Sequence, residues 1–257
     1  MRSLFVVSVF LAATASANIN SFLRTAFKSI SPQTVVNAEP VHTIQTLKDG
    51  DWPTVHTYEN FELDAVVNTW DPTTKTLTQY KNMTMNQKID TRGNRELTSM
   101  KSDIPNLGYT EIITYVDFTT NVLYQRIPDL NICNHMDNPV PWNLTQFFAA
   151  AQDPKRGLTQ YLGVQQKEWA THDLHAFNLT LDVKGKGKES EVLYFCTKTL
   201  DLKFITVDSQ PTVVVQIPRI QEKLFTDDDF KGQDCSTQKT PHFIKDIDFA
   251  RAHSLLF

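Results

Sequence analysis

Features that identify several common protein classes are missing from this chain of 257 residues. After the N-terminal segment, no stretch reaches the roughly 18 consecutive apolar residues of a membrane-spanning helix. Of the 25 basic residues, 24 remain once Arg2 is removed with a predicted signal peptide, against 29 acidic ones, so the net charge becomes −5. This mildly acidic chain has no basic block, which argues against nucleic acid as a partner and against an electrostatic membrane anchor.

Motifs of common enzyme classes are missing as well. The G-x-S-x-G nucleophile elbow does not occur, no cysteine has the surroundings of a catalytic thiol, and the seven histidines are scattered. Gly185–Lys188 lacks the spacing of a phosphate-binding loop and is predicted to connect two strands. We therefore expect a protein that is not an enzyme, with a lumenal hydrolase as the weakest of three hypotheses.

The N-terminus has the pattern of a secretory signal peptide over residues 1–17. Arg2 is followed by the apolar run Leu4–Ala13 and by the small residues Ala15–Ala17 of a cleavage site. The mature chain is then expected to begin at Asn18 and to be secreted, with a lysosomal or other endomembrane lumen as the alternative. Three N-x-[ST] sequons support this prediction, and their asparagines are Asn82, Asn143 and Asn178.

The rest of the chain predicts a mainly β protein. After a helix at Ser21–Ile30 and a linker within residues 18–40, strand-like runs separated by turn residues fill residues 41–240. The predicted strands are Phe61–Trp70, Leu77–Ile89, Tyr109–Phe118, Val122–Ile127, Leu174–Val183, Glu191–Thr197, Leu202–Val207 and Thr212–Ile217. Helical spacing predicts one helix at Asn143–Gln152 and a second within the tail 241–257. Many adjacent hairpins with few helices favour antiparallel sheets over one core.

Two sequons predict which face of a strand is buried, because a glycan must face solvent and successive side chains alternate. If Asn82 and Thr84 point outward, Met83, Met85 and Ile89 point inward. By the same argument, outward Asn178 and Thr180 place Phe177, Leu179 and Leu181 inside. The predicted inner surface is broad and aromatic and contains methionine.

The hairpin at 112–127 and the cysteine that follows it resemble the ependymin-related proteins, secreted glycoproteins with a V-L-Y/F-x-I strand before a cysteine. Further segments resemble the family in the same order along the chain. They are Asn86–Arg95, Tyr161–Trp169, Glu191–Cys196, and Leu224–Thr226 followed by Cys235. The resemblance covers about residues 86–235.

This resemblance implies two antiparallel sheets with a hydrophobic cavity between them that takes up a lipid or fatty acid. It also implies a response to calcium, for which Asp227, Asp228 and Asp229 are weak candidates, and a homodimer. The family has further cysteines that this chain lacks. The implied disulfide is Cys133–Cys235, and Cys196 is left as a free thiol that we expect to be buried and inert.

The ligand-cavity candidates are inward-facing methionines and aromatic residues: Met83, Met85, Tyr124, Phe147, Phe148, Trp169, Phe177 and Leu179. The alternative is that these side chains fill a solid core, so that the protein is a structural or adhesion glycoprotein of the cell surface or matrix. No metal site is expected at His172 and His175, because their spacing places the rings on opposite faces of a strand. We expect both to be surface histidines.

Overall fold

The computed structural model describes residues 52–104, 107–137, 143–183, 187–207, 212–233 and 235. The predicted signal peptide, the predicted helix at Ser21–Ile30 and the tail from residue 241 lie outside the described residues.

Eleven strands within the described residues form one antiparallel sheet, in the order β6-β5-β4-β3-β2-β1-β11-β10-β9-β8-β7. One meander consists of β1 (Asn60–Asp71), β2 (Thr76–Asp90), β3 (Arg95–Ile104), β4 (Gly108–Asp117), β5 (Val122–Ile127) and β6 (Ile132–Asp137). The second consists of β7 (Thr159–Gln165), β8 (Leu174–Val183), β9 (Gly187–Cys196), β10 (Leu202–Val207) and β11 (Thr212–Glu222). The short helices are η1 (Pro128–Leu130), α2 (Leu144–Ala151), η2 (Pro154–Arg156) and η3 (Asp227–Phe230).

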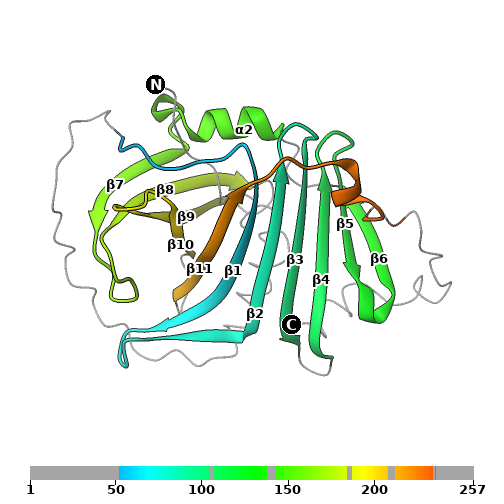
Figure 1. Cartoon of the computed structure of the whole chain (residues 1–257), viewed down its shortest axis with the longest axis horizontal. Helices are drawn as coiled ribbons and strands as arrows, with labels where there is room; N and C mark the ends of the chain where they lie inside the picture. Colours follow the sequence, from blue (N-terminus) through cyan, green and yellow to red (C-terminus); the bar gives the residue numbers. More distant parts are fainter. Residues whose placement is uncertain are drawn as a thin grey trace.

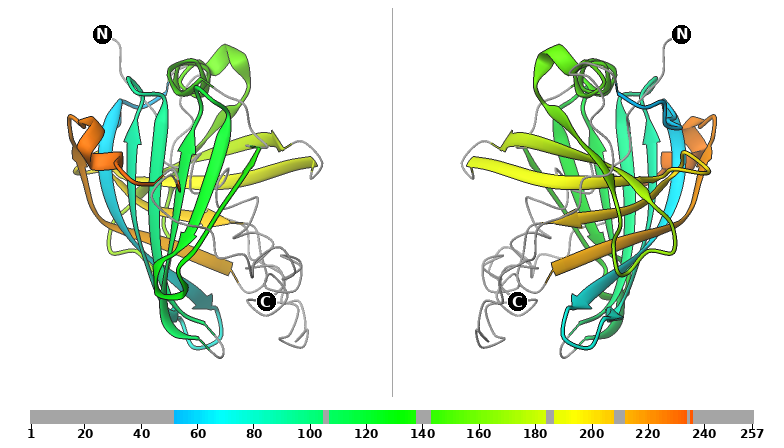
Figure 2. Two further views of the ribbon diagram at one scale, coloured as in Figure 1. Left: turned by 90° about the vertical axis from the view of Figure 1, so that its right-hand side faces the viewer. Right: turned by 90° about the vertical axis from the view of Figure 1, so that its left-hand side faces the viewer.

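The two meanders are joined edge to edge by β1 and β11. Their pairing runs from Phe61 opposite Glu222 to Trp70 opposite Thr212, while the other edge of β1 pairs with β2. In Figure 1, β1 to β6 run side by side and β7 to β10 run across them. Figure 2 shows that the two halves are steeply inclined to each other, because the sheet curves strongly.

The prediction of a mainly β, antiparallel protein with few helices is confirmed. Instead of two sheets, however, the structure has one continuous sheet, because β1 forms hydrogen bonds along both of its edges. All eight predicted strands occur, and the helix predicted at Asn143–Gln152 is α2. Three strands, β3, β6 and β7, were not predicted from the sequence.

Two hairpins begin with the same turn, in which an aspartate at the end of a strand accepts hydrogen bonds from the backbone N–H groups two and three residues later. Asp71 Oδ1 accepts hydrogen bonds from the backbone N–H of Thr73 and Thr74, and Asp117 Oδ1 accepts them from Thr119 and Thr120. In the second turn, Asn121 then adopts φ = 59°, a left-handed conformation that asparagine tolerates. This local chemistry explains why the hairpin around residues 119–121 was predictable from the sequence.

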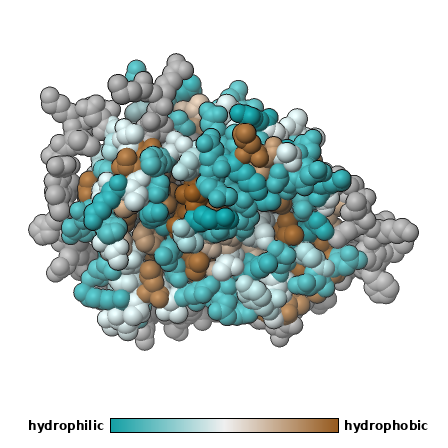
Figure 3. Space-filling model, viewed as in Figure 1, coloured by the Kyte–Doolittle hydropathy of each residue, from teal (hydrophilic) through white to brown (hydrophobic). Residues whose placement is uncertain are grey.

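The main hydrophobic core lies on one face of the curved sheet, which we call the concave face. Buried apolar residues from β1 to β5 and from β8 to β11 form a single cluster there. Helix α2 adds its apolar side to the same cluster, with Leu144, Phe147, Phe148 and Ala151. Figure 3 shows part of the outside of the molecule, where hydrophilic residues predominate and hydrophobic atoms occur in small separate groups.

A C-terminal strap, residues 223–233 and 235, is tied to the first meander by charged groups. Arg95 on β3 donates hydrogen bonds to Asp90 (2.9 Å) and to Asp227 (2.8 Å), and its guanidinium lies 4.3 Å from the centre of the Phe230 ring. Arg126 on β5 donates from Nη1 to Gly232 O at 2.8 Å and to the side-chain oxygen of Gln233 at 3.0 Å.

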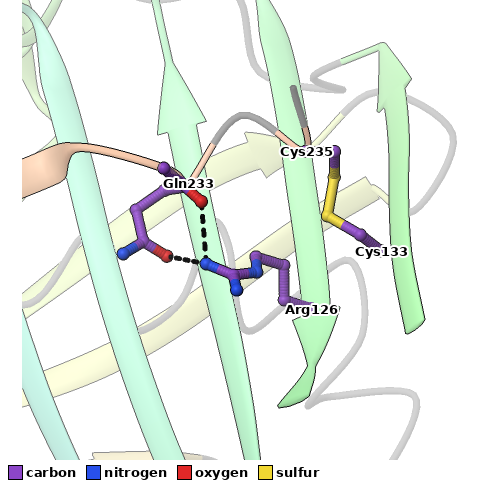
Figure 4. Close-up of a disulfide and its surroundings, with 5 residues drawn as sticks. Arg126, Cys133, Gln233 and Cys235 are labelled. Carbon is purple, nitrogen blue, oxygen red and sulfur yellow. Dashed lines mark hydrogen bonds between the residues drawn. A yellow bond between two sulfur atoms is a disulfide. The ribbon is translucent and has the colours of Figure 1, made fainter. Parts of the chain in front are cut away.

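The strap ends in a disulfide between Cys235 and Cys133 of β6, the pair that the family resemblance implies. Figure 4 shows this bond beside the Arg126 hydrogen bonds. Since Arg126 and Cys133 are register partners, the strap is attached to two neighbouring strands at the edge of the sheet.

We expect the double variant Cys133→Ser/Cys235→Ser to remain folded but to lose stability. The disulfide joins residues separated by 102 positions. On the chain-entropy model, a loop of this size is worth roughly 4–5 kcal/mol. Urea unfolding should show this loss, and reduction of the wild-type protein should reproduce it while leaving the variant unchanged. A loss below about 1 kcal/mol would show that the disulfide does not constrain the unfolded chain in this way.

Asn143 is both the predicted glycosylation site of a sequon and the N-cap of α2, and substitutions can separate these two roles. Asn143 Oδ1 accepts a hydrogen bond from the backbone N–H of Gln146 at 3.0 Å. Asn143→Gln and Thr145→Ala should both remove a glycan in a glycosylating host, which mass spectrometry would detect. Only Asn143→Gln also removes the cap, so it should cost about 1 kcal/mol more in denaturant unfolding. Equal stability of the two variants would contradict the capping role.

Candidate functional site

The concave face is the candidate site, because it collects apolar side chains from both meanders. Phe61, Leu63, Phe177, Phe195 and Leu123 are all completely or almost completely buried there. The segment before β1 packs against the same cluster through Val55, and the backbone N–H of His56 donates to Leu200 O at 2.7 Å. Strands, helix and leading segment therefore share one apolar layer.

Six of the eight residues predicted to line a ligand cavity belong to this layer. Their exposed fractions range from 0 to 6%, and they are Met83, Met85, Phe147, Phe148, Phe177 and Leu179. The faces predicted from the sequons are correct for the described side chains: Asn82 is exposed, Asn178 is half-buried, and their apolar neighbours are buried. Whether these residues hold a ligand stays a prediction.

The other two predicted residues, Tyr124 and Trp169, lie on the opposite, convex face, and this part of the prediction is wrong. Tyr124 stacks on Tyr115 at 5.8 Å between ring centres, while its neighbour Leu123 is buried in the concave core. Trp169 lies in the connection between β7 and β8 and packs against Trp70 and Tyr194, at 5.6 and 6.3 Å. Aromatic character alone does not indicate a face, whereas strand alternation does.

Half-buried apolar residues border the concave core. They are Trp52, Tyr58, Tyr80, Ile112, Leu158, Tyr161 and Ile220. Two of them contact the central aromatic residue Phe177: Trp52 edge-on at 5.9 Å and Tyr161 at 4.8 Å. Each of these border residues packs an apolar part of its side chain against the core and leaves another part exposed to solvent.

One polar pair, Tyr161 and His175, lies within this aromatic border. The Tyr161 hydroxyl is 2.9 Å from His175 Nδ1, and His175 shares its side of β8 with Phe177. Burial lowers the pKa of His175 and raises the pKa of Tyr161, so both groups favour their neutral forms. His175 is thus a half-buried core group and not the surface residue that was predicted, while His172 is exposed.

A row of polar side chains crosses the concave face of the first meander. Gln87, Thr98, Thr114 and Gln125 are successive register partners on β2, β3, β4 and β5. Gln87 and Thr98 are buried, whereas Thr114 and Gln125 are half-buried. We call these four residues the polar row. The polar row could not be predicted from the sequence, because its members become neighbours only when the strand register is known.

The carboxylate of Glu96 organises the inner end of the polar row. Glu96 Oε1 accepts hydrogen bonds from Gln87 Nε2 at 2.8 Å and from the Thr98 hydroxyl at 2.9 Å. Glu96 is only 1% exposed. The side chains of Gln87, Glu96 and Thr98 therefore place a hydrogen-bonded polar group among the apolar residues of the concave core.

The three aspartates that were weak calcium candidates each pair with a different basic side chain and do not converge on one metal position. Asp227 pairs with Arg95, Asp228 with Lys231, and Asp229 with Lys223. Asp229 also accepts hydrogen bonds from the backbone N–H and hydroxyl of Thr226, which lower the pKa of its carboxyl group. Asp229 takes part in the capping box of η3, and Asp227 fastens the strap to β3. Across the described ranges, no group of three His, Cys, Asp or Glu residues is placed to hold a metal.

The free thiol of Cys196 is 2% exposed, as expected. Burial raises the pKa of the thiol, but hydrogen bonds from the Thr199 and Lys198 backbone and the charge of Lys203 outweigh it and lower the pKa. The burial of this thiol is confirmed, while its lack of reactivity stays a prediction.

Comparisons with known proteins add little to this description. No family model matches the chain, and no curated protein matches its sequence. Among solved structures, it is similar to a domain from Vibrio parahaemolyticus described as an outer membrane lipoprotein-sorting protein, with 9% identity, a TM-score of 0.33, and coverage of 69% of this chain and 91% of that one. A LolA superfamily protein from Nitrosomonas europaea has 10% identity, a TM-score of 0.33, and coverage of 68% and 91%. Likeness at this level identifies no ligand.

Among the described residues, no helix is both long enough and apolar enough to cross a membrane.

We expect the stability of the protein to decrease as the pH falls below about 6.5, the ordinary pKa of histidine. Burial lowers the pKa of His175 in the folded state, so between the two pKa values the unfolded chain binds a proton that the folded chain does not. The contribution of neutral His175 to stability is therefore fully present above the pKa of histidine in the unfolded chain. It is lost as the pH falls toward the lower pKa of His175 in the folded protein. Urea unfolding at pH 7.5, 6.5 and 5.5 should show this slope, and His175→Gln should reduce it. An unchanged slope in the variant would rule out His175 as its source.

Proposed function

We propose that this chain is a secreted, ependymin-like glycoprotein that carries a hydrophobic molecule on the concave face of its sheet, and that it is not an enzyme. One observation supports this proposal most strongly. Six residues selected from the sequence as cavity-lining lie in one apolar layer, and half-buried aromatic side chains border that layer. An apolar guest would meet an accessible apolar margin with the buried apolar layer behind it.

Binding would be driven by the transfer of apolar surface out of water. The gain is about 25 cal/mol per Å² of apolar area buried, less the cost of immobilising the ligand and nearby side chains. The methionines Met83 and Met85 suit this role because an unbranched thioether adapts to irregular shapes.

The positions of the sequons are compatible with this function. Asn82 and Asn143 are exposed, and Asn178 lies on the side of β8 opposite Phe177, with its amide donating to the Thr180 hydroxyl at 3.2 Å. Glycans at these three sites would leave the concave face uncovered.

The competing function is that of a structural or adhesion glycoprotein with a filled core. It is favoured by the near-complete burial of the central residues, since Met83 and Phe177 are both 0% exposed. On this hypothesis the apolar layer stabilises the fold and binds nothing.

Adjacent isoleucines on β4 allow a matched test. Ile112 packs against the concave core, whereas Ile113 points to the convex face, and both are half-buried. We would express the full chain in a secreting eukaryotic host and analyse bound molecules by native mass spectrometry and organic extraction. The wild-type protein and Ile113→Glu should retain an apolar molecule, and Ile112→Glu should lose most of it.

Two results would overturn the proposal. One is a wild-type protein that contains no apolar molecule and takes up none when incubated with lipid vesicles. The other is equal retention of the bound molecule by Ile112→Glu and Ile113→Glu, which would place it elsewhere than on the concave face.

A further inference from the structure

The inner end of the polar row contains a buried hydrogen-bond acceptor without a donor. Gln87 is 0% exposed and lies on the concave side of β2 between Met85 and Ile89, which both belong to the hydrophobic core. No hydrogen-bond donor within the described residues reaches Gln87 Oε1. A buried polar atom in this state costs free energy unless something supplies the missing hydrogen bond.

The orientation of the Gln87 amide follows from its contact with Glu96. Its nitrogen lies 2.8 Å from the Glu96 carboxylate, where the amide oxygen would be repelled. The amide oxygen must therefore point away from Glu96. The unpaired atom is an acceptor, and a molecule that satisfies it has to bring an N–H or O–H group.

The neighbours of Gln87 do not supply that group. The Thr98 hydroxyl is the nearest donor across the register, and it is directed to Glu96 Oε1 at 2.9 Å. In the β2–β3 pair, the inward positions on either side of Gln87 and Thr98 are Met85 opposite Met100 and Ile89 opposite Glu96. These neighbouring side chains are therefore apolar or, in the case of Glu96, an acceptor. Acceptors are therefore in excess at the inner end of the row.

We propose that the hydrophobic ligand carries a hydroxyl or primary amine, whose hydrogen is accepted by Gln87 Oε1. This inference rests on the proposed carrier function and narrows its ligand class to amphiphiles with a donor group, such as long-chain alcohols, sterols or long-chain amines. An ionised fatty acid offers only acceptors and leaves Gln87 unsatisfied. The half-buried Thr114 and Gln125 continue the polar row toward the edge of the sheet and provide contacts for a second polar group of the same ligand.

The test uses ligands that share one alkyl chain and differ in the polar group. Delipidated, secreted full-length protein is loaded with the apolar fluorophore diphenylhexatriene, which is then displaced by 1-octadecanol, octadecylamine, octadecyl methyl ether or octadecanoate. The ether is the key comparison, because it retains the oxygen and adds apolar surface but lacks the donor. We expect the alcohol or the amine to bind about tenfold more tightly than the ether, the effect of one buried hydrogen bond that would otherwise be missing.

Two variants locate the effect. Gln87→Met preserves the approximate volume but removes the acceptor, and it should bring the alcohol, the amine and the ether to nearly equal affinity. Gln216→Met is the matched control, since Gln216 is exposed and lies on the convex side of β11 between the core residues Val215 and Ile217. The control should keep the wild-type preference.

The outcomes separate this inference from the function on which it rests. If the fluorophore and all four ligands fail to bind, the carrier function itself is wrong. If they bind but wild-type protein does not distinguish alcohol and amine from ether, or prefers octadecanoate, the donor requirement is wrong and Gln87 is satisfied by an internal water or protein group. The wild-type comparison decides this even if Gln87→Met does not fold.

Discussion

The pairing of β1 with β11 is the interaction on which the rest of the structure depends. It joins segments about 150 residues apart and converts two meanders into one continuous sheet. Because β1 also pairs with β2, its inward residues Phe61 and Leu63 contact core residues from both halves. A sheet of eleven strands with the normal twist must curve, and that curvature places one shared apolar layer on the concave face.

The two faces of this sheet are stabilised by different mixtures of interactions. On the convex side, charged groups act together with a small apolar cluster around Leu174, Ala176 and Tyr194. Arg219 of β11 bonds Asp64 of β1 at 2.6 Å, and Lys223 of the strap bonds Glu62 of β1 at 3.1 Å. The lowered pKa of Glu62 reflects this, since burial raises it but hydrogen bonds from Lys223 and Asn86 outweigh that effect. The concave side depends on apolar burial, and the polar row is its main exception. Within this row, the unpaired Gln87 Oε1 is the atom whose burial costs stability.

The strands that were predicted and those that were missed differ in one property. In β8, Phe177 and Leu179 alternate with Asn178 and Thr180, so the sequence itself identifies the inner face. In β3, the inward side chains include Glu96, Thr98 and Ser102, all buried but polar, so alternation of apolar residues disappears. Two of these three residues, Thr98 and Glu96, belong to the polar row and its carboxylate.

The sequence alone determined the local features: the antiparallel β class, the hairpin turns capped by Asp71 and Asp117, helix α2, and the inward faces of β2 and β8. Each of these depends on residues close together in the chain. Tertiary structure decided that the sheet is continuous, that Tyr124 and Trp169 lie outside, that His175 lies within the aromatic border, and that Gln87 adjoins Glu96. These features depend on which strands pair and in which register, and the pairing is set by the burial of the whole apolar surface at once, not by any single segment.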